Sequence, residues 1–187
     1  MSKPWDSLLP ESVTVAGEEY AIRSDFRAML DICVALSDPE LEEQERGEVV
    51  LRIFYPELEK IPYTAYQEAI AKCFWFLNGG VEERKSSPGP KLVDWEKDFP
   101  RIVSPINRVM GTEIRTLPHL HWWTFLAAYY EIGDCLFAQI VRIRSLKAAG
   151  KLKDPQDKAW YRKNRDLVDM QTAYTSEEKA TISGWMV

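Results

Sequence analysis

The chain lacks any hydrophobic run long enough to cross a membrane. Its longest apolar segments are residues 73–77 and 122–130, whereas a transmembrane helix needs roughly 20 apolar residues. Residues 1–9 also lack the apolar core of a secretory signal peptide. We therefore expect a protein that has no membrane segment and stays in the cytoplasm where it is made.

Cysteine is scarce, and the three residues of this type are Cys33, Cys73 and Cys135. Their number is odd, they lie far apart, and no CxxC pair occurs. This pattern argues against a disulfide framework and against a zinc site. We expect each cysteine to be a small, buried hydrophobic residue in a reducing compartment.

Histidine is scarcer still, with only His119 and His121 in the chain. Residues two apart on a helix point about 200° away from each other, so this pair cannot hold a metal ion from one helix face. A capping or packing role is favoured, because no other ligand type has suitable spacing nearby. The GxSxG, HExxH, P-loop and GxGxxG motifs are also missing.

Carboxylates gather at Asp94, Glu96 and Asp98, which invites an acid–base or metal-binding interpretation. The simpler explanation is that they cap the N-terminus of a helix and interact favourably with its dipole. We therefore predict no catalytic, cofactor-binding or metal-binding residue and no cofactor, and we expect a protein that is not an enzyme.

The chain does contain enough apolar material for a sizeable core, with 45% hydrophobic and 12% aromatic residues. Residues 13–15 and 20–22 are rich in β-prone side chains and flank a glycine-containing loop at 16–19. This arrangement predicts an N-terminal β-hairpin. Helical periodicity follows the hairpin.

Seven helices are predicted. They begin near Ser24, Glu40, Thr64, Phe99, His119, Asp134 and Pro155. Ser24 and Asp134 are the expected N-caps of the first and sixth helices, Thr64 starts a capping-box pattern, and Asp154 precedes a proline at a first helical position. Pro105 is expected to kink or split the helix over residues 99–110.

These features predict a mainly α-helical protein, a single compact domain of about six or seven helices with a short N-terminal β-hairpin. Residues 1–23 form the N-terminal segment and hairpin, and residues 24–169 form the helical domain. The segment 81–92 is charged and rich in Ser, Pro and Gly, so it is a predicted flexible loop. Residues 170–187 are a predicted loose tail.

Charge is spread unevenly along the chain, whose net charge is −5. Residues 1–60 hold 14 acidic and 6 basic side chains, and residues 134–170 hold 5 acidic and 9 basic ones. Such polarity suits head-to-tail self-association or contacts with different partners, and two solvated helix faces of opposite sign explain it equally well.

The basic stretch also contains Trp160 and Tyr161, and nucleic acid binding requires such cationic and aromatic residues. Its basic residues are Arg142, Arg144, Lys147, Lys151, Lys153, Lys158, Arg162, Lys163 and Arg165. Interspersed acids and the overall pI of about 5.2 oppose a dedicated nucleic-acid binder.

Aromatic side chains are unusually dense on two predicted helices, which they cover on most sides. A helix that is apolar all round is either central in the core or a surface that binds a partner. Tryptophan and tyrosine are enriched at interface anchors. The candidate partner-binding residues are Trp122, Trp123, Tyr129, Trp75 and Trp160.

Several segments, taken in order, resemble a family of phage proteins. They are Ser24–Arg27 after the hairpin, Asp94–Asp98 followed by Ile102, His121–Leu126, and Ile140–Arg144 followed by Tyr161–Lys163. Over roughly residues 5–165 this set is similar to the bacteriophage gene product fifteen family of siphophage tail modules. Pro100 and Pro105 depart from the family pattern, and residues 170–187 lie beyond the match.

The resemblance implies a small protein encoded beside the tape-measure gene of a phage or prophage, with a role in tail assembly and no catalytic residues. The leading hypothesis is a non-enzymatic chaperone or adaptor for the tape-measure protein and other tail-assembly proteins, acting in the cytoplasm of the host bacterium. The alternatives are a minor structural component of the finished tail and a nucleic-acid-binding helical protein. No membrane partner is expected.

Overall fold

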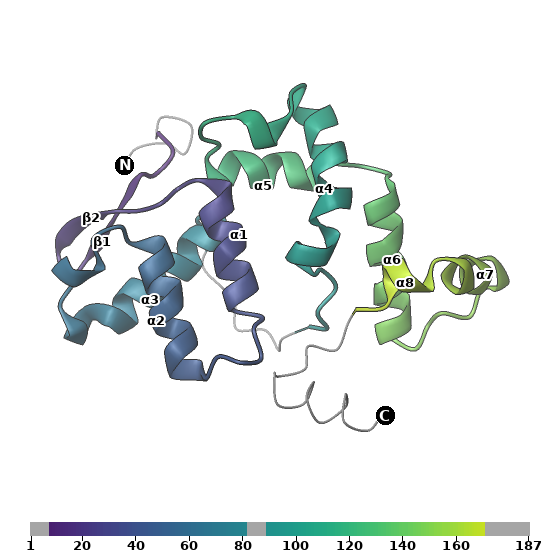
Figure 1. Cartoon of the computed structure of the whole chain (residues 1–187), viewed down its shortest axis with the longest axis horizontal. Helices are drawn as coiled ribbons and strands as arrows, with labels where there is room; N and C mark the ends of the chain where they lie inside the picture. Colours follow the sequence, from purple (N-terminus) through teal and green to yellow (C-terminus); the bar gives the residue numbers. More distant parts are fainter. Residues whose placement is uncertain (1–7, 82–88, 171–187) are drawn as a thin grey trace, which may run out of the picture. The chain divides into compact units, whose positions relative to one another are not determined.

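The computed structural model describes residues 8–81 and 89–170 of the chain. Within them it contains a two-stranded antiparallel hairpin followed by eight α-helices (Figure 1), so the predicted mainly helical fold with an N-terminal hairpin is confirmed. Most of the predicted loop at 81–92, and nearly all of the predicted tail at 170–187, lie outside the described residues. None of the described helices is long and apolar enough to span a membrane.

The chain groups into two compact units, and one boundary between them falls within the segment 81–92 that the sequence marks as a loop. The first unit comprises Met1–Arg84 and Leu117–Ala127, and the second comprises Lys85–Thr116 and Ala128–Val187. Each unit is therefore built from two separate stretches of the chain.

A tight hairpin begins the described part of the first unit. Strand β1 (Ser12–Val15) pairs with β2 (Glu18–Ala21) through a two-residue turn at Ala16 and Gly17. Both turn residues have positive φ, 51° and 86°, as the favoured two-residue hairpin turn requires. The expected four-residue loop is therefore wrong, because Glu18 and Glu19 already belong to β2.

Four helices build the rest of the first unit. They are α1 (Phe26–Ala35), α2 (Glu43–Phe54), α3 (Tyr66–Leu77) and the first part of α5 (Trp122–Tyr130). Aromatic rings dominate their shared core, where Phe26 stacks on Phe125 with centroids 5.0 Å apart and Phe54 lies 5.4 Å from Phe76.

Two of the predicted helix caps in this unit are wrong. Asp25, and not Ser24, caps α1, because its carboxylate accepts the N–H of Arg27 while the Ser24 hydroxyl bonds elsewhere. The capping box expected at Thr64 is replaced by a 3₁₀ turn over Tyr63–Ala65, and α3 starts without a side-chain cap. Local hydroxyl side chains favour a cap only when no stronger partner is near.

The second unit contains α4 (Trp95–Met110), α6 (Leu136–Ala148), α7 (Pro155–Lys163) and α8 (Arg165–Val168). The predicted caps Asp94 and Asp154 are confirmed by their bonds to N–H groups of the first helical turns. Pro105 lies inside α4, which continues to Met110, so the helix is not split there. Cys135 caps α6 in place of the predicted Asp134.

A buried ion pair lies at the centre of the second unit. The guanidinium of Arg144 donates hydrogen bonds to both carboxylate oxygens of Asp98 and to the carbonyl oxygens of Leu92, Leu167 and Val168. All the acceptors are held within 3.0 Å. This one side chain therefore joins α6 to α4, to α8 and to the segment before α4.

Candidate functional site

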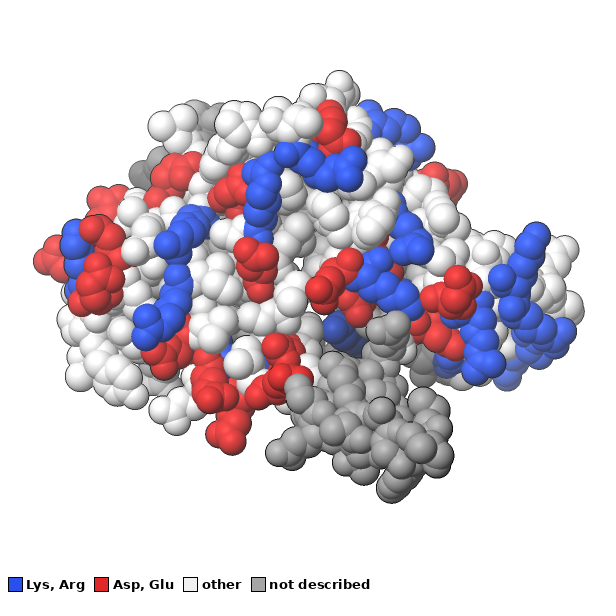
Figure 2. Space-filling view, in the orientation of Figure 1, with Lys and Arg blue, Asp and Glu red and all other residues white. Residues whose placement is uncertain are grey.

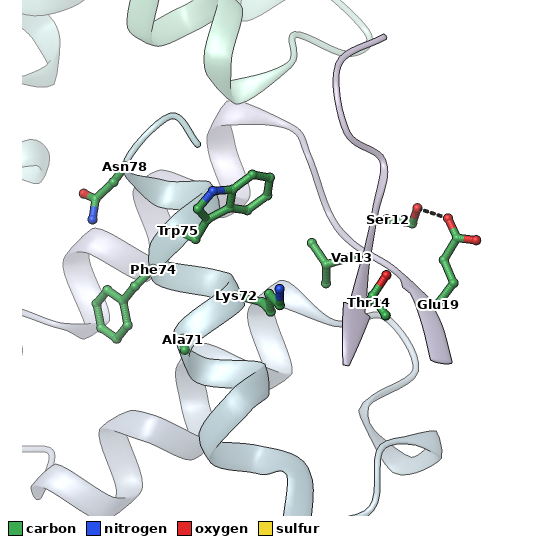
Figure 3. Close-up of a pocket in the computed structure, with 9 residues that line it drawn as sticks. All are labelled: Ser12, Val13, Thr14, Glu19, Ala71, Lys72, Phe74, Trp75 and Asn78. Atoms are coloured by element: carbon green, nitrogen blue, oxygen red, sulfur yellow. Dashed lines mark hydrogen bonds between the residues drawn. The ribbon is translucent and has the colours of Figure 1, made fainter. Parts of the chain in front are cut away.

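An open groove of about 700 Å³ lies between β1 and α3 in the first unit (Figure 3). Its lining residues are Ser12, Val13, Thr14, Glu19, Ala71, Lys72, Phe74, Trp75 and Asn78. We refer to it as the β1–α3 groove.

The helical wall of the β1–α3 groove carries its apolar surface. Ala71, Phe74, Trp75 and Asn78 recur at spacings of three and four residues, so they share one side of α3. The rings of Phe74 and Trp75 are half-buried. Figure 3 shows the Trp75 indole on the side of α3 that faces the hairpin. Part of a large aromatic ring is therefore available to a ligand in the groove.

The strand wall of the groove is an unpaired sheet edge. In a two-residue hairpin the closing pair exchanges hydrogen bonds, and such pairs alternate along the ladder. Val13 and Val15 therefore bond to β2, while the backbone groups of Ser12 and Thr14 point away from it. No residue in 8–81 or 89–170 hydrogen-bonds to the backbone of Ser12 or Thr14.

Carboxylates surround the turn end of the groove. Glu68, one turn before Lys72 on α3, accepts a hydrogen bond from the N–H of Ala16 at 3.1 Å. Glu18 is exposed at the same turn, and Glu19 lines the groove. Lys72 is the one cation among the lining residues, so the groove and its turn end are acidic on balance.

Trp122, one of the predicted partner contacts, is a core residue. Its side chain is 2% exposed, its indole N–H donates to the carbonyl oxygen of Leu77 at 2.8 Å, and its ring stacks on Phe125. A ring with this packing cannot touch a partner while the unit stays folded. The prediction of a contact at Trp122 is therefore corrected.

Trp123 connects the core to the groove. Its indole N–H donates to the carbonyl oxygen of Phe76, and its ring meets Trp75 edge-on with centroids 5.5 Å apart. The ring also fills the space beside Gly80, where a Cβ would come within 2.7 Å of it. Trp123 is half-buried, and its contact with the Trp75 ring helps to fix the position of that ring.

The other two predicted contacts, Tyr129 and Trp160, are not among the residues that line the β1–α3 groove. Both belong to the second unit, and both are half-buried. Tyr129 packs against Trp95 and Phe137, and burial raises the pKa of its hydroxyl to about 12. Their role as partner contacts stays a prediction.

Ser24, His119 and Glu11 form a hydrogen-bonded chain in the first unit. The Ser24 hydroxyl donates to the Glu11 carboxylate at 2.6 Å, and His119 Nε2 lies 3.0 Å from the same hydroxyl oxygen. In a catalytic triad the carboxylate bonds to the imidazole and leaves the hydroxyl to the base. Here the carboxylate bonds to the hydroxyl of Ser24, a residue that is 3% exposed, so the chain of bonds serves to join three segments.

His121 acts as a helix cap. Its Nδ1 accepts the N–H of Trp123 at 3.0 Å, and its Nε2 faces the carbonyl oxygen of Pro10 at 3.1 Å. The first bond requires an unprotonated Nδ1, so the proton is assigned to Nε2. The predicted capping role is confirmed for this residue.

The cysteines are free in the structure. Burial raises the pKa of both Cys33 and Cys73 to about 12, which keeps these thiols protonated and weakly nucleophilic at neutral pH. Across residues 8–81 and 89–170, no group of three or more His, Cys, Asp and Glu side chains is placed to hold a metal ion.

The basic stretch of the sequence is partly neutralised in the second unit. Arg144 is buried against Asp98, Arg142 pairs with Asp157, and Lys147 and Arg165 both pair with Asp169. Five of its basic residues are exposed and have no ion pair within the described part of the chain: Lys151, Lys153, Lys158, Arg162 and Lys163. Figure 2 shows basic side chains gathered over this end of the second unit.

The groove as a whole was not foreseen from the sequence. Trp75 was a predicted contact, but no sequence pattern indicated that Ser12, Thr14 or Lys72 would line a groove. The groove forms only when segments almost 60 residues apart in the chain come together. The hairpin prediction was the available clue, since a two-stranded sheet always has free edges.

The fold and this groove together define a mainly helical protein with a ligand-sized surface groove beside an N-terminal hairpin. The family model described as Bacteriophage Gp15 protein matches residues 5–170, and the chain therefore belongs to this family of phage proteins. No curated protein and no solved structure matches the chain.

Proposed function

We propose that this chain is a non-enzymatic phage tail-assembly protein that binds the tape-measure protein as a chaperone or adaptor in the cytoplasm of the host bacterium. The observation that carries the proposal is the β1–α3 groove, which offers the half-buried ring of Trp75 on the surface of a phage protein. Its tail-assembly context is the one that the sequence resemblance implies.

A tape-measure protein is a long chain of largely apolar segments that would aggregate if it were left exposed before the tail tube forms. A partner with an apolar groove shields such segments, since large exposed apolar patches are the usual cause of aggregation. An open groove lined by the rings of Phe74 and Trp75 suits transient binding, because a few buried aromatic contacts carry most of the energy of such interfaces.

Co-expression with the tape-measure protein of the same phage tests this function. We expect the chain to raise the soluble yield of the tape-measure protein and to co-purify with it. The Trp75→Ala variant should lose much of this effect, and Tyr130→Ala, a change at an exposed aromatic residue outside the groove, should keep it. If the unmodified chain neither solubilises nor retains the tape-measure protein, the proposal is wrong.

The alternative of a minor structural component makes a different prediction for the finished particle. An assembly factor leaves before the tail is complete, whereas a structural component remains in it. Mass spectrometry of purified virions separates these possibilities, and recovery of the chain in stoichiometric amount would favour the structural role.

A further inference from the structure

We propose that the β1–α3 groove binds an extended, cationic segment of a partner protein, which pairs with the free edge of β1 as a third strand. This inference rests on the proposed function for the partner's identity, but it goes further by specifying the binding mode and the chemistry of the bound segment.

The backbone of β1 is available for strand addition. Ser12 and Thr14 direct their N–H and C=O groups away from β2, and no hydrogen bond from the described residues reaches them. Unpaired edges are templates for another strand, and proteins that recognise extended peptides use them in this way. The β1 edge also faces the groove, because side chains from both faces of the strand, Val13 and Thr14, line it.

The hairpin would gain from a third strand. Within the described residues its sheet has only two strands of four residues each, and an isolated two-stranded sheet is marginally stable. Val13 and Val15 fix it to the core on one face, at 6% and 0% exposure. The added strand would therefore pair with an edge that is already held in place.

The side chains beside the edge specify the bound segment. Trp75 offers an apolar surface to a side chain on one face of an added strand, because side chains alternate between the two faces. At the turn end, Glu18, Glu19 and Glu68 outnumber the single cation Lys72. Opposite charge steers association and suppresses wrong partners, so the segment should carry lysine or arginine where it passes the hairpin turn.

Binding of the synthetic peptide acetyl-Lys-Val-Thr-Phe-Thr-Val-Lys-amide to the full chain tests the mode directly, with tryptophan fluorescence or calorimetry as the readout. Thr14→Pro removes an edge N–H that has no partner in the described structure, and proline is tolerated at sheet edges. The matched control Thr14→Ala keeps that N–H. We expect Thr14→Pro to weaken binding about tenfold or more and Thr14→Ala to change it little.

A second measurement covers the case in which Thr14→Pro unfolds the hairpin. Two copies of the peptide, each N-methylated at one of the two sets of alternate residues, each have one blocked edge. Binding of the copy whose blocked edge meets β1 should fall by a similar factor. The Glu68→Gln variant keeps an oxygen acceptor for the N–H of Ala16. It should lower the affinity for the peptide at low salt, and the difference from the unmodified chain should disappear at high salt. Absence of saturable peptide binding, or equal binding of both methylated copies and the unmethylated peptide, overturns the strand-addition mode.

The same variants separate this inference from the proposed function. If Thr14→Pro and Thr14→Ala retain the tape-measure protein equally well, the partner binds in another way, for example as a helix, and the strand mode is overturned while the function stands. If the peptide binds with the expected sensitivity but the tape-measure protein is not retained by the unmodified chain, the groove is a strand-binding site and the proposed partner is wrong.

Discussion

Arg144 and Asp98 are charged side chains that the second unit buries almost completely, with 4% and 1% of their side-chain surfaces exposed. A buried ion pair contributes little beyond what an apolar pair would give, because both charges must leave water. Removing one partner is costly, since the other charge then stays buried without compensation.

We expect Asp98→Ala to lower the free energy of unfolding by about 3–5 kcal/mol. The reason is that Arg144 would keep its carbonyl acceptors but lose its only carboxylate in the described structure. Denaturant titration followed by circular dichroism measures the change. The control is Asp157→Ala, which breaks the more exposed pair with Arg142 and should cost less than about 1 kcal/mol. Equal losses in the two variants would contradict the assigned role of the pair.

The burial and the contacts of single side chains were harder to predict from the sequence than the helices and strands. Arg144 stood in a basic stretch that suggested solvent exposure, and its partner Asp98 is 46 residues away. Trp122 and Trp75 are the same residue type on apolar helices, yet one is a core residue and the other lines the groove. Which ring is buried depends on the neighbouring elements, and spacing along one helix does not reveal it.

At the level of elements, local chemistry predicted much of the fold. The hairpin was recognised from β-prone runs around Gly17, and the start of α7 from Asp154 and the proline after it, since both patterns act within a few residues. Ser24 failed as a predicted cap because Glu11 and His119, from distant parts of the sequence, take its hydroxyl. Tertiary partners therefore override cap propensity where they are available.

Asp169 follows the short helix α8 and accepts hydrogen bonds from Lys147, Tyr161 and Arg165, so its charge should make the stability of the fold depend on pH. Desolvation raises the pKa of this carboxyl group, but hydrogen bonds from Lys147, Arg165 and Tyr161 outweigh it and lower the pKa from 3.8 to about 2. The charged form is therefore favoured in the folded state. Its stabilising effect is present above the unfolded pKa near 4 and is lost as the pH falls towards 2.

Replacing the carboxylate by an amide removes that titration. We expect the free energy of unfolding of Asp169→Asn to fall less than that of the unmodified chain as the pH is lowered from about 4 to about 2. Urea titrations at a series of pH values measure the difference. Asp134→Asn, at an exposed position with no ion pair among residues 8–81 and 89–170, is the matched control and should follow the unmodified chain. Parallel curves for Asp169→Asn and the unmodified chain would remove Asp169 from this role.

At the scale of the whole molecule, charge is unevenly distributed, with an excess of acidic residues over 1–60 and of basic residues over 134–170. Figure 2 shows acidic side chains over the hairpin and the start of α2, and basic ones over α6 and α7. In the described structure, internal ion pairs neutralise part of the basic stretch over residues 142–165, and five of its cations are exposed without an ion pair. Both self-association and simple solvation are compatible with this distribution.

Sedimentation equilibrium at low and high salt distinguishes the two. If copies associate head to tail through opposite charges, the average mass should exceed that of the monomer at low ionic strength and return to it near 1 M salt, where screening reaches about 3 Å. Lys158→Glu combined with Arg162→Glu should abolish the low-salt association. A mass that stays monomeric at every salt concentration shows that the charges are only solvated.

The two-stretch composition of the first unit has a consequence for how the chain is made. Trp122 and Phe125 complete the core around Phe26 and Phe76, yet they lie after the whole of residues 85–116. When synthesis has just passed Leu77, the segments of the hairpin and of α1, α2 and α3 have been made. Trp122 and Phe125, which complete their core, have not. The core of this unit is complete only once residue 127 has been synthesised, so apolar side chains such as Phe26 and Phe76 lack part of their packing partners until then.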